Sequence, residues 1–268
     1  MYFRKDNLSI MLKIDRQRFI EDELKKYGSI LISDMSQKLS CSEETIRRDL
    51  RELESEDKLK RIHGGAFLPD SDIEDKSVPI YLRETFISDV KDKLAAYIVS
   101  NFILENDTIM LDSSTTCLSL AKAIIRSGIK VTIITNSLRI MDLFRDEVTS
   151  IKIIGIGGIF KQKSGSFIGS QAINSISNFV SDKSFISPSA IDIKYGIVDN
   201  NLNESHIRKA YIKHSRKTFL VVDHTKLDDI ADFIISPISD IDCIVTDETI
   251  SKEWEDTLKN LAIPVEYC

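Results

Sequence analysis

The chain has 268 residues, of which 42% are hydrophobic and 29% are charged, and its formal net charge is −6. These proportions are those of an ordinary soluble protein with room for one small and one mid-sized domain. The first 68 residues carry 14 basic and 13 acidic side chains, so the acidity lies in the remainder of the chain. Bulk positive charge is therefore excluded as a means of binding nucleic acid, and such binding would depend on a few placed cations.

The sequence lacks the marks of membrane, secreted and zinc proteins. No apolar run approaches the ~20 residues of a membrane span, and charges interrupt the N-terminal stretch MYFRKDNLSIMLKI, unlike a signal peptide. The cysteines and histidines show no metal-ligand spacing: they are Cys41, Cys117, Cys243 and Cys268, and His63, His206, His214 and His224. We expect a reduced, cytoplasmic protein with no cofactor and no metal.

Two short amphipathic helices are predicted near the start of the chain. Residues 16–27 have a helical pattern that stops at Gly28, a residue suited to ending a helix. Residues 33–39 form the second helix, and residues 40–41 connect it tightly to a third. This is the spacing of a helix-turn-helix.

The third helix combines an apolar face with a basic one. Ser42 stands as its N-cap, and Ile46, Leu50 and Leu53 recur at helical spacing. The opposite face carries three arginines: Arg47, Arg48 and Arg51. Such a face can lie along a phosphate-lined groove. Because the helix also carries four glutamates, an ordinary solvated face is the alternative.

A basic hairpin follows this helix. Residues 60–62 and 66–68 are predicted strands, and the intervening His63, Gly64 and Gly65 form the turn, where adjacent glycines permit positive φ angles. The flank of the hairpin is basic: it carries Lys58, Lys60 and Arg61. Helix and hairpin together predict the recognition helix and wing of a winged helix-turn-helix.

Two pieces of this region closely resemble the signature of the DeoR family of bacterial repressors. They are residues 45–50 (TIRRDL) and residues 61–66 (RIHGGA), and the resemblance extends over nearly the whole chain. It implies an operator-binding domain followed by an effector-sensing domain. The residues predicted to contact DNA are Ser42, Thr45, Arg47, Arg48, Arg51, Lys60, Arg61, His63 and Gly64.

Beyond the hairpin, strands alternate with helices. Residues 69–80 are acidic and have one proline near each end, Pro69 and Pro79. This composition predicts a linker between domains at 1–68 and 81–268. Helices are predicted at 83–102, 117–126, 138–145, 171–179, 204–214 and 250–261, and strands at 108–111, 131–135, 151–154, 183–186, 219–222, 243–246 and 264–266, with a polar loop after Gly158. This alternation predicts an α/β domain with a mostly parallel sheet covered on both faces.

Such sheets bind ligands beyond the carboxyl ends of their strands. Three loops there carry polar candidates: Asp112, Ser113, Thr115 and Thr116 in the first, Gly157 and Gly158 in the second, and Asp223 and Lys226 in the third. Hydroxyls and amides at a helix start suit a phosphate, and a carboxylate with an ammonium suits a sugar phosphate. Each loop has a plain alternative: a helix cap, a flexible turn, and a helix-initiating Asp beside a surface Lys.

The family resemblance bears on these loops. The second domain of DeoR proteins resembles ribose-5-phosphate isomerase and related sugar-phosphate and coenzyme A transferase folds, which implies a phosphorylated sugar as effector. It also adds four candidate binding residues: Arg83, Lys91, Glu204 and Arg208. The chain departs from the family pattern in three places: Ser114 replaces a glycine, residues 187–190 (SPSA) replace a glycine-rich loop, and Arg208 replaces a lysine. These departures leave the effector's identity open.

The leading hypothesis is a sugar-phosphate-controlled repressor of a carbohydrate-metabolism operon, and not an enzyme. Its partners would be double-stranded operator DNA and a second copy of the chain, as a homodimer or homotetramer, because symmetric pairs usually read operators. One alternative is a DNA-binding regulator whose second domain only oligomerises. The other is a sugar-phosphate isomerase with Asp112, Asp223 or Glu204 as its base.

Overall fold

The computed structural model describes residues 12–268 except 63, 69–79, 86, 146–149 and 230. The chain divides into two compact units, Met1–Ser71 with Tyr81–Phe86 and Asp72–Ile80 with Ile87–Cys268. Most of the predicted linker lies outside the described residues. The sequence starts the second domain at residue 81, whereas the structure groups Tyr81–Phe86 with the first unit.

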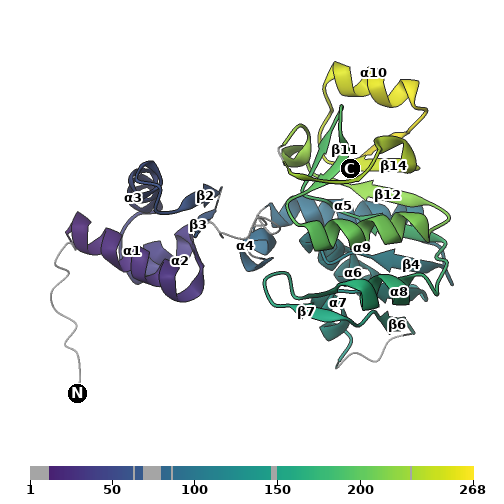
Figure 1. The fold of residues 1–268 in the computed structure, drawn as a ribbon, viewed down its shortest axis with the longest axis horizontal. Helices are drawn as coiled ribbons and strands as arrows, with labels where there is room; N and C mark the ends of the chain where they lie inside the picture. The colour runs from purple at the N-terminus through teal and green to yellow at the C-terminus, as the bar shows by residue number, and fades with distance from the viewer. Residues whose placement is uncertain (1–11, 63, 69–79, 86, 146–149, 230) are drawn as a thin grey trace. The chain divides into compact units, whose positions relative to one another are not determined.

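The first unit contains the three predicted helices and a small sheet (Figure 1). Its elements are α1 (Lys13–Tyr27), β1 (Ser29–Leu31), α2 (Ile32–Lys38), α3 (Glu43–Ser55), β2 (Lys60–Ile62) and β3 (Gly65–Phe67). The sheet is antiparallel, in the order β1-β3-β2. Ile20 and Leu24 of α1 pack with Ile46 and Leu50 of α3 in one buried cluster. The sequence did not indicate β1, since three residues are too few to show an alternation.

Local signals account for the ends of these helices. Gly28 follows α1 with a φ angle of 77°, the left-handed conformation that glycine adopts at little cost. The hydroxyl of Ser42 accepts a hydrogen bond from the amide of Thr45 at 3.2 Å, which caps α3 as predicted. Arg16 of α1 forms an ion pair with the buried Asp49 of α3, so charge as well as apolar contact joins these helices.

The predicted hairpin is present, with one correction. Gly65 pairs with Ile62 across the hairpin and with Leu31 of β1, so it belongs to a strand and not to the turn. Pairing on both sides fixes the backbone of Gly65 in the extended conformation of the sheet. His63 lies outside the described residues, and the carbonyl of Gly64 accepts a hydrogen bond from the amide of Ile32 at 2.9 Å.

The helix predicted over residues 83–102 is two helices, α4 (Ile80–Thr85) and α5 (Ser88–Phe102). Ile87 precedes α5 with a φ angle of 42°, in the left-handed region. A β-branched residue rarely adopts this conformation, and the stretch contains no glycine or proline to signal a break. Tertiary structure therefore overrides local helical propensity at this point.

The second unit is built on a seven-stranded sheet, all of whose neighbouring strands are parallel. In spatial order its strands are β15 (Val265–Tyr267), β14 (Cys243–Thr246), β12 (Thr218–Val221), β9 (Lys183–Ile186), β4 (Thr108–Leu111), β5 (Thr132–Thr135) and β6 (Lys152–Gly155). The predicted parallel α/β sheet is confirmed, with β15 as an edge strand.

Helices cover both faces of this sheet (Figure 1). One apolar cluster joins the sheet to α5, α6 (Thr115–Ser127) and α7 (Leu138–Asp142), and the other joins it to α8 (Ser170–Ile176), α9 (Leu202–Lys213) and α10 (Lys252–Asn260). Met110 belongs to the second cluster, whereas its neighbours Ile109 and Leu111 belong to the first. The strands are thus apolar on both sides, which explains their unbroken hydrophobic runs.

Five short strands of the second unit were not predicted. The expected polar loop after Gly158 contains the hairpin β7 (Ile159–Lys161) and β8 (Ser166–Ile168), and a separate antiparallel sheet comprises β10 (Ala190–Asp192), β11 (Gly196–Asp199) and β13 (Phe233–Ser236). No α-helix separates β7 from β8 or β10 from β11, so these strands lack the strand–helix alternation by which the equally short strands of the parallel sheet were recognised. Two 3₁₀ turns, η1 (His224–Lys226) and η2 (Ile238–Asp240), complete the unit. Among the described residues, no helix is long and apolar enough to cross a membrane.

Candidate functional site

The outer face of α3 presents the predicted arginines. Ile46 and Leu50 are fully buried on the opposite side. Arg47 donates to Glu43 at 2.7 Å and Arg51 donates to Glu44 at 3.1 Å, both within the same helix. Ion pairs this exposed contribute little and are screened by salt. Phosphate oxygens can therefore replace the glutamates as acceptors without disturbing the helix.

The wing is attached to α3 through Arg61. Its Nε atom and its backbone amide both donate to the carboxylate of Glu54, near the end of the helix. Lys60, its neighbour in β2, is exposed. Arg61 thus has a structural partner that the sequence did not indicate, and its predicted DNA contact is untested. The side chain of Thr45 bonds the hydroxyl of the capping Ser42 at 2.8 Å.

In the second unit, the polar candidates gather where the chain changes direction across the sheet. From β4 the chain runs through β5 to β6 at one edge, and it then returns to β9 on the other side of β4. The carboxyl ends of β4 and β9 therefore flank a topological switch point, the usual ligand site of open α/β sheets. Asp112 follows β4, Ser187 follows β9, and α6 begins beside them.

Asp112 is the centre of a buried hydrogen-bond network at this point. Its side chain accepts from the amides of Ser114 and Ser187, each at 2.9 Å, and from Nε of Arg208 at 2.7 Å. Burial favours the protonated form, but the Arg208 guanidinium and these hydrogen bonds outweigh it, so the pKa of Asp112 lies below its ordinary value. Asp112 is therefore a buried carboxylate in its charged form.

Arg208 balances two carboxylates. Its side chain is 4% exposed, and it donates to Asp112 through Nε and to Asp199 of β11 through Nη1. Burial lowers the pKa of Arg208, but the two carboxylates more than offset this, and the net shift is upward. These contacts are those of an internal counter-ion. The effector contact expected for Arg208 is untested and would require rearrangement of these pairs.

Glu204 joins the first loop to the unpredicted hairpin. Its carboxylate accepts from the hydroxyl of Ser113 at 2.9 Å and from the hydroxyl of Ser166 in β8. Ser166 in turn bonds Ser164 at 2.7 Å. The sequence placed Glu204 and Ser113 in the site but did not indicate Ser166, because it treated that stretch as a loop.

Lys226 reaches the start of α6 through a serine. Its Nζ atom donates to the hydroxyl of Ser187 at 2.6 Å, and that hydroxyl donates to Thr116 at 3.1 Å. Lys226 is half-buried, whereas Thr115 and Thr116 are buried in the first turn of the helix. An ammonium group and a helix N-terminus thus meet at the switch point, an arrangement that suits an anion.

The family departures fall inside this network. Ser114, in place of a glycine, caps α6 by accepting from the amide of Cys117 at 3.1 Å. Ser187, the first residue of the departing 187–190 loop, carries the hydroxyl that links Lys226 to Thr116. The substitutions therefore supply hydrogen bonds that a glycine side chain cannot make.

The remaining candidates are placed differently. Asp223 caps η1 by accepting from the amide of Thr225 at 3.1 Å, which corresponds to the plain alternative for this residue. A Cβ atom on Gly158 would lie 2.6 Å from the carbonyl oxygen of Ile168, so this glycine permits close packing. Gly157 is exposed next to it. Their effector contacts are untested.

Two basic candidates lie on helices ahead of the sheet. Lys91 is buried on α5, with 4% of its surface exposed. Arg83 belongs to α4, in the segment Tyr81–Phe86 that groups with the first unit. The effector contacts expected for Lys91 and Arg83 are untested.

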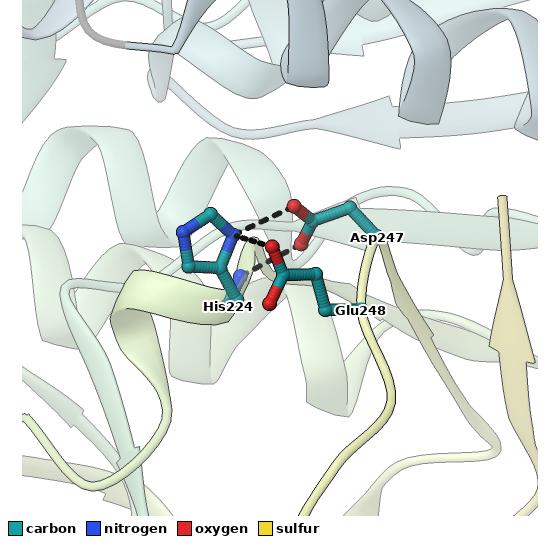
Figure 2. A group of neighbouring side chains, drawn as sticks. All are labelled: His224, Asp247 and Glu248. Atoms are coloured by element: carbon teal, nitrogen blue, oxygen red, sulfur yellow. Dashed lines mark hydrogen bonds and ion pairs between the residues drawn. The ribbon is translucent and has the colours of Figure 1, made fainter.

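One group of side chains was not expected. Figure 2 shows His224 of η1 facing Asp247 and Glu248, which follow β14. The Nδ1 atom of His224 lies 2.7 Å from Asp247 Oδ2 and 3.6 Å from Glu248 Oε1. Hydrogen bonding to Asp247 raises the pKa of His224. The sequence showed no metal-ligand grouping for this histidine, because 23 residues separate it from Asp247 and only the pairing of β12 with β14 brings them together.

Two protein-family profiles match the chain. One, described as a DeoR-like helix-turn-helix domain, matches residues 16–72, and the other, described as the DeoR C terminal sensor domain, matches residues 88–248. The chain belongs to the DeoR family. It is thus a DNA-binding transcriptional regulator with a sensor domain for a small molecule, and it is not an enzyme.

Two relatives match over nearly their full length. A Bacillus subtilis (strain 168) DeoR relative, the uncharacterized HTH-type transcriptional regulator YulB, is 35% identical, covering 95% of this chain and 98% of its own. The glycerol-3-phosphate regulon repressor of Escherichia coli (strain K12) is 28% identical, covering 96% of this chain and 100% of its own. Among solved structures, ribose 5-phosphate isomerase A from Methanocaldococcus jannaschii aligns with a TM-score of 0.37 and 15% identity over 52% of this chain and 54% of that one.

Proposed function

We propose that this DeoR-family regulator is a cytoplasmic repressor of a carbohydrate-metabolism operon and that a phosphorylated sugar controls its binding to double-stranded operator DNA. The observation that carries the effector proposal is the meeting of Lys226, Ser187 and Thr116 at the switch point. The name of the E. coli relative, a glycerol-3-phosphate regulon repressor, supports a phosphorylated polyol or sugar as the class of effector.

The chemistry of the switch point suits a phosphate dianion. The first amides of a helix have no acceptor within the helix, and α6 is 13 residues long. The ammonium of Lys226 adds a full positive charge beside them. The carboxylates of Asp112 and Glu204 suit the hydroxyls of a sugar, provided that the ligand takes over some of their present hydrogen bonds.

The DNA contacts are proposed for α3 and the wing. Arg47, Arg48 and Arg51 would meet bases or phosphates in the major groove, while the basic wing lies along the backbone. A homodimer or homotetramer is proposed because one winged helix covers few base pairs and operators generally carry two related half-sites.

The test is an effector titration of operator-bound protein. Lys226→Ala should need roughly ten- to a hundredfold more sugar phosphate than the wild type, since losing a charge-assisted hydrogen bond costs about 1.5–3 kcal/mol. Operator affinity without effector should be unchanged, because Lys226 lies in the other unit. Lys122→Ala, which removes an exposed lysine from α6, is the matched control. Equal midpoints for Lys226→Ala and Lys122→Ala would place the effector elsewhere.

A regulator whose second domain only oligomerises is the second candidate. It is favoured by the internal hydrogen bonds of the network, because Arg208 already pairs with two carboxylates and Glu204 already accepts from two serines. In that case a broad panel of sugar phosphates would leave the melting temperature and operator binding of the wild type unchanged, since a true ligand stabilises the fold it binds.

A further inference from the structure

The geometry points to a divalent transition-metal site formed by His224, Asp247 and Glu248, beside the proposed effector site but independent of it. The three side chains offer one imidazole nitrogen and two carboxylate oxygens, and these atoms all lie within 4.8 Å of one another. Among the described residues, no other group of three or more histidine, cysteine and carboxylate side chains is close enough to share an ion.

The spacing of the donors suits one ion after small movements. Two ligands about 2.1 Å from one ion in tetrahedral geometry lie about 3.4 Å apart. The distance of 3.6 Å between His224 Nδ1 and Glu248 Oε1 is already close to this value. The distance of 2.7 Å to Asp247 Oδ2 is that of a hydrogen bond and must lengthen by less than about 1 Å.

The backbone holds two of the donors in place. His224 and Asp247 follow β12 and β14, neighbouring parallel strands paired from Phe219 to Val221. The amide of His224 donates to Asp247 Oδ1 at 2.7 Å, which orients that carboxylate. Glu248 is 63% exposed and can close over the ion from the solvent side (Figure 2).

Charge and donor type select the ion. Two carboxylates and a neutral imidazole carry a charge of −2, which a divalent cation neutralises. Nitrogen and oxygen donors together favour Zn²⁺, Co²⁺ or Mn²⁺, whereas Mg²⁺ and Ca²⁺ prefer oxygen alone. Three protein donors leave a coordination position open to water or to an oxygen of a second ligand. His224 and Lys226 both belong to η1, so the metal site adjoins the proposed phosphate site along the chain.

The test is calorimetric titration of the full chain with ZnCl₂ after dialysis against a chelator. The chain carries Cys268→Ser throughout, because the exposed Cys268 follows β15 and its amide bonds the carbonyl of Thr246, next to Asp247. One Zn²⁺ ion should bind per chain. His224→Gln and Glu248→Gln should each weaken binding at least roughly tenfold. His206→Gln, which changes an exposed histidine on α9, is the matched control and should bind as the parent does.

The visible spectrum of the Co²⁺-loaded protein gives a second readout, and its absorption should be lost in His224→Gln but kept in His206→Gln. Glu248 is largely exposed, so Glu248→Gln tests the site without threatening the fold. The assignment fails if the parent shows no saturable Zn²⁺ site, or if Glu248→Gln and His224→Gln bind like His206→Gln. Saturable binding of MgCl₂ alone would also overturn it. None of these outcomes depends on the response to sugar phosphates.

Discussion

Charged side chains are arranged in opposite ways in the two units of this chain. On α3, Arg47 and Arg51 pair with glutamates three to seven positions away in the same helix, and all of these groups are exposed. At the switch point, Arg208 pairs with Asp112, 96 positions away, and all of its charge is buried. The first arrangement leaves arginines available to a partner, whereas the second uses its arginine to join distant segments.

The two arrangements imply different contributions of the arginines to the stability of the fold. An exposed pair gives the fold little, so its arginine can exchange the glutamate for an external acceptor at little cost in stability. A buried charge that loses its partner is costly, so the residue is needed for the fold itself. The two regions should therefore respond differently to the same kind of substitution.

The largest effect is expected from Arg208→Met. It removes the guanidinium and leaves Asp112 and Asp199 as buried charges without their counter-ion, which should cost about 3–5 kcal/mol of unfolding free energy. Urea unfolding followed by the fluorescence of Trp254, the single tryptophan and a buried residue of α10, would measure it. Arg126→Met, on the exposed surface of α6, should leave the midpoint unchanged. An unchanged midpoint for Arg208→Met would show that these buried pairs contribute as little to stability as the exposed pairs on α3.

The next effect concerns pH. Asp112→Asn keeps the shape of the side chain but removes its charge, and it should cost about 1.5–3 kcal/mol at pH 7. The folded-state pKa of Asp112 is depressed, so the carboxylate stabilises the fold above its unfolded pKa of about 3.9 and loses this contribution as pH falls through the folded value. The difference from wild type in urea unfolding should therefore shrink below about pH 4. A constant difference would contradict the assignment, and Asp256→Asn, on the exposed side of α10, is the control.

Arg47→Ala or Arg48→Ala should affect function and spare the fold. Each should cost about 1–3 kcal/mol of operator binding if the residue contacts a base. The unfolding midpoint should not change, because both side chains lie opposite the buried Ile46 and Leu50. Gel-shift titration measures the first quantity, and Arg126→Ala serves as the control of equal charge. Unaltered operator affinity in a folded double variant would show that α3 is not the recognition helix.

The smallest effect is expected from Ser42→Ala. Loss of the cap on Thr45 should destabilise α3 by roughly 1 kcal/mol. Since the chain has two units and need not unfold in one step, the local measurement is hydrogen exchange at the first amides of α3. Ser33→Ala, in the exposed part of α2, should leave these amides unchanged. Equal exchange rates in the two variants would show that the Ser42 side chain does not stabilise the start of α3.

The sequence was informative where a structure depends on neighbouring residues. Gly28 ends α1 and Ser42 begins α3 as their residue types predict. Within the second unit, the strands at 108–111, 183–186 and 243–246 have the predicted bounds. It was uninformative at Ile87, where no local signal marks the break between α4 and α5. It also did not indicate six short antiparallel strands: β1, β7, β8, β10, β11 and β13.

By itself, the sequence determined the helical and strand periods, the caps, the parallel α/β class and the family, because each rests on residues a few positions apart or on a continuous motif. Only the tertiary structure decided that Arg208 lies between Asp112 and Asp199, that Ser187 links Lys226 to α6, and that His224 meets Asp247. These contacts depend on the order of strands across the sheet. Strand order is set by packing both apolar faces at once, and no local stretch of sequence records it.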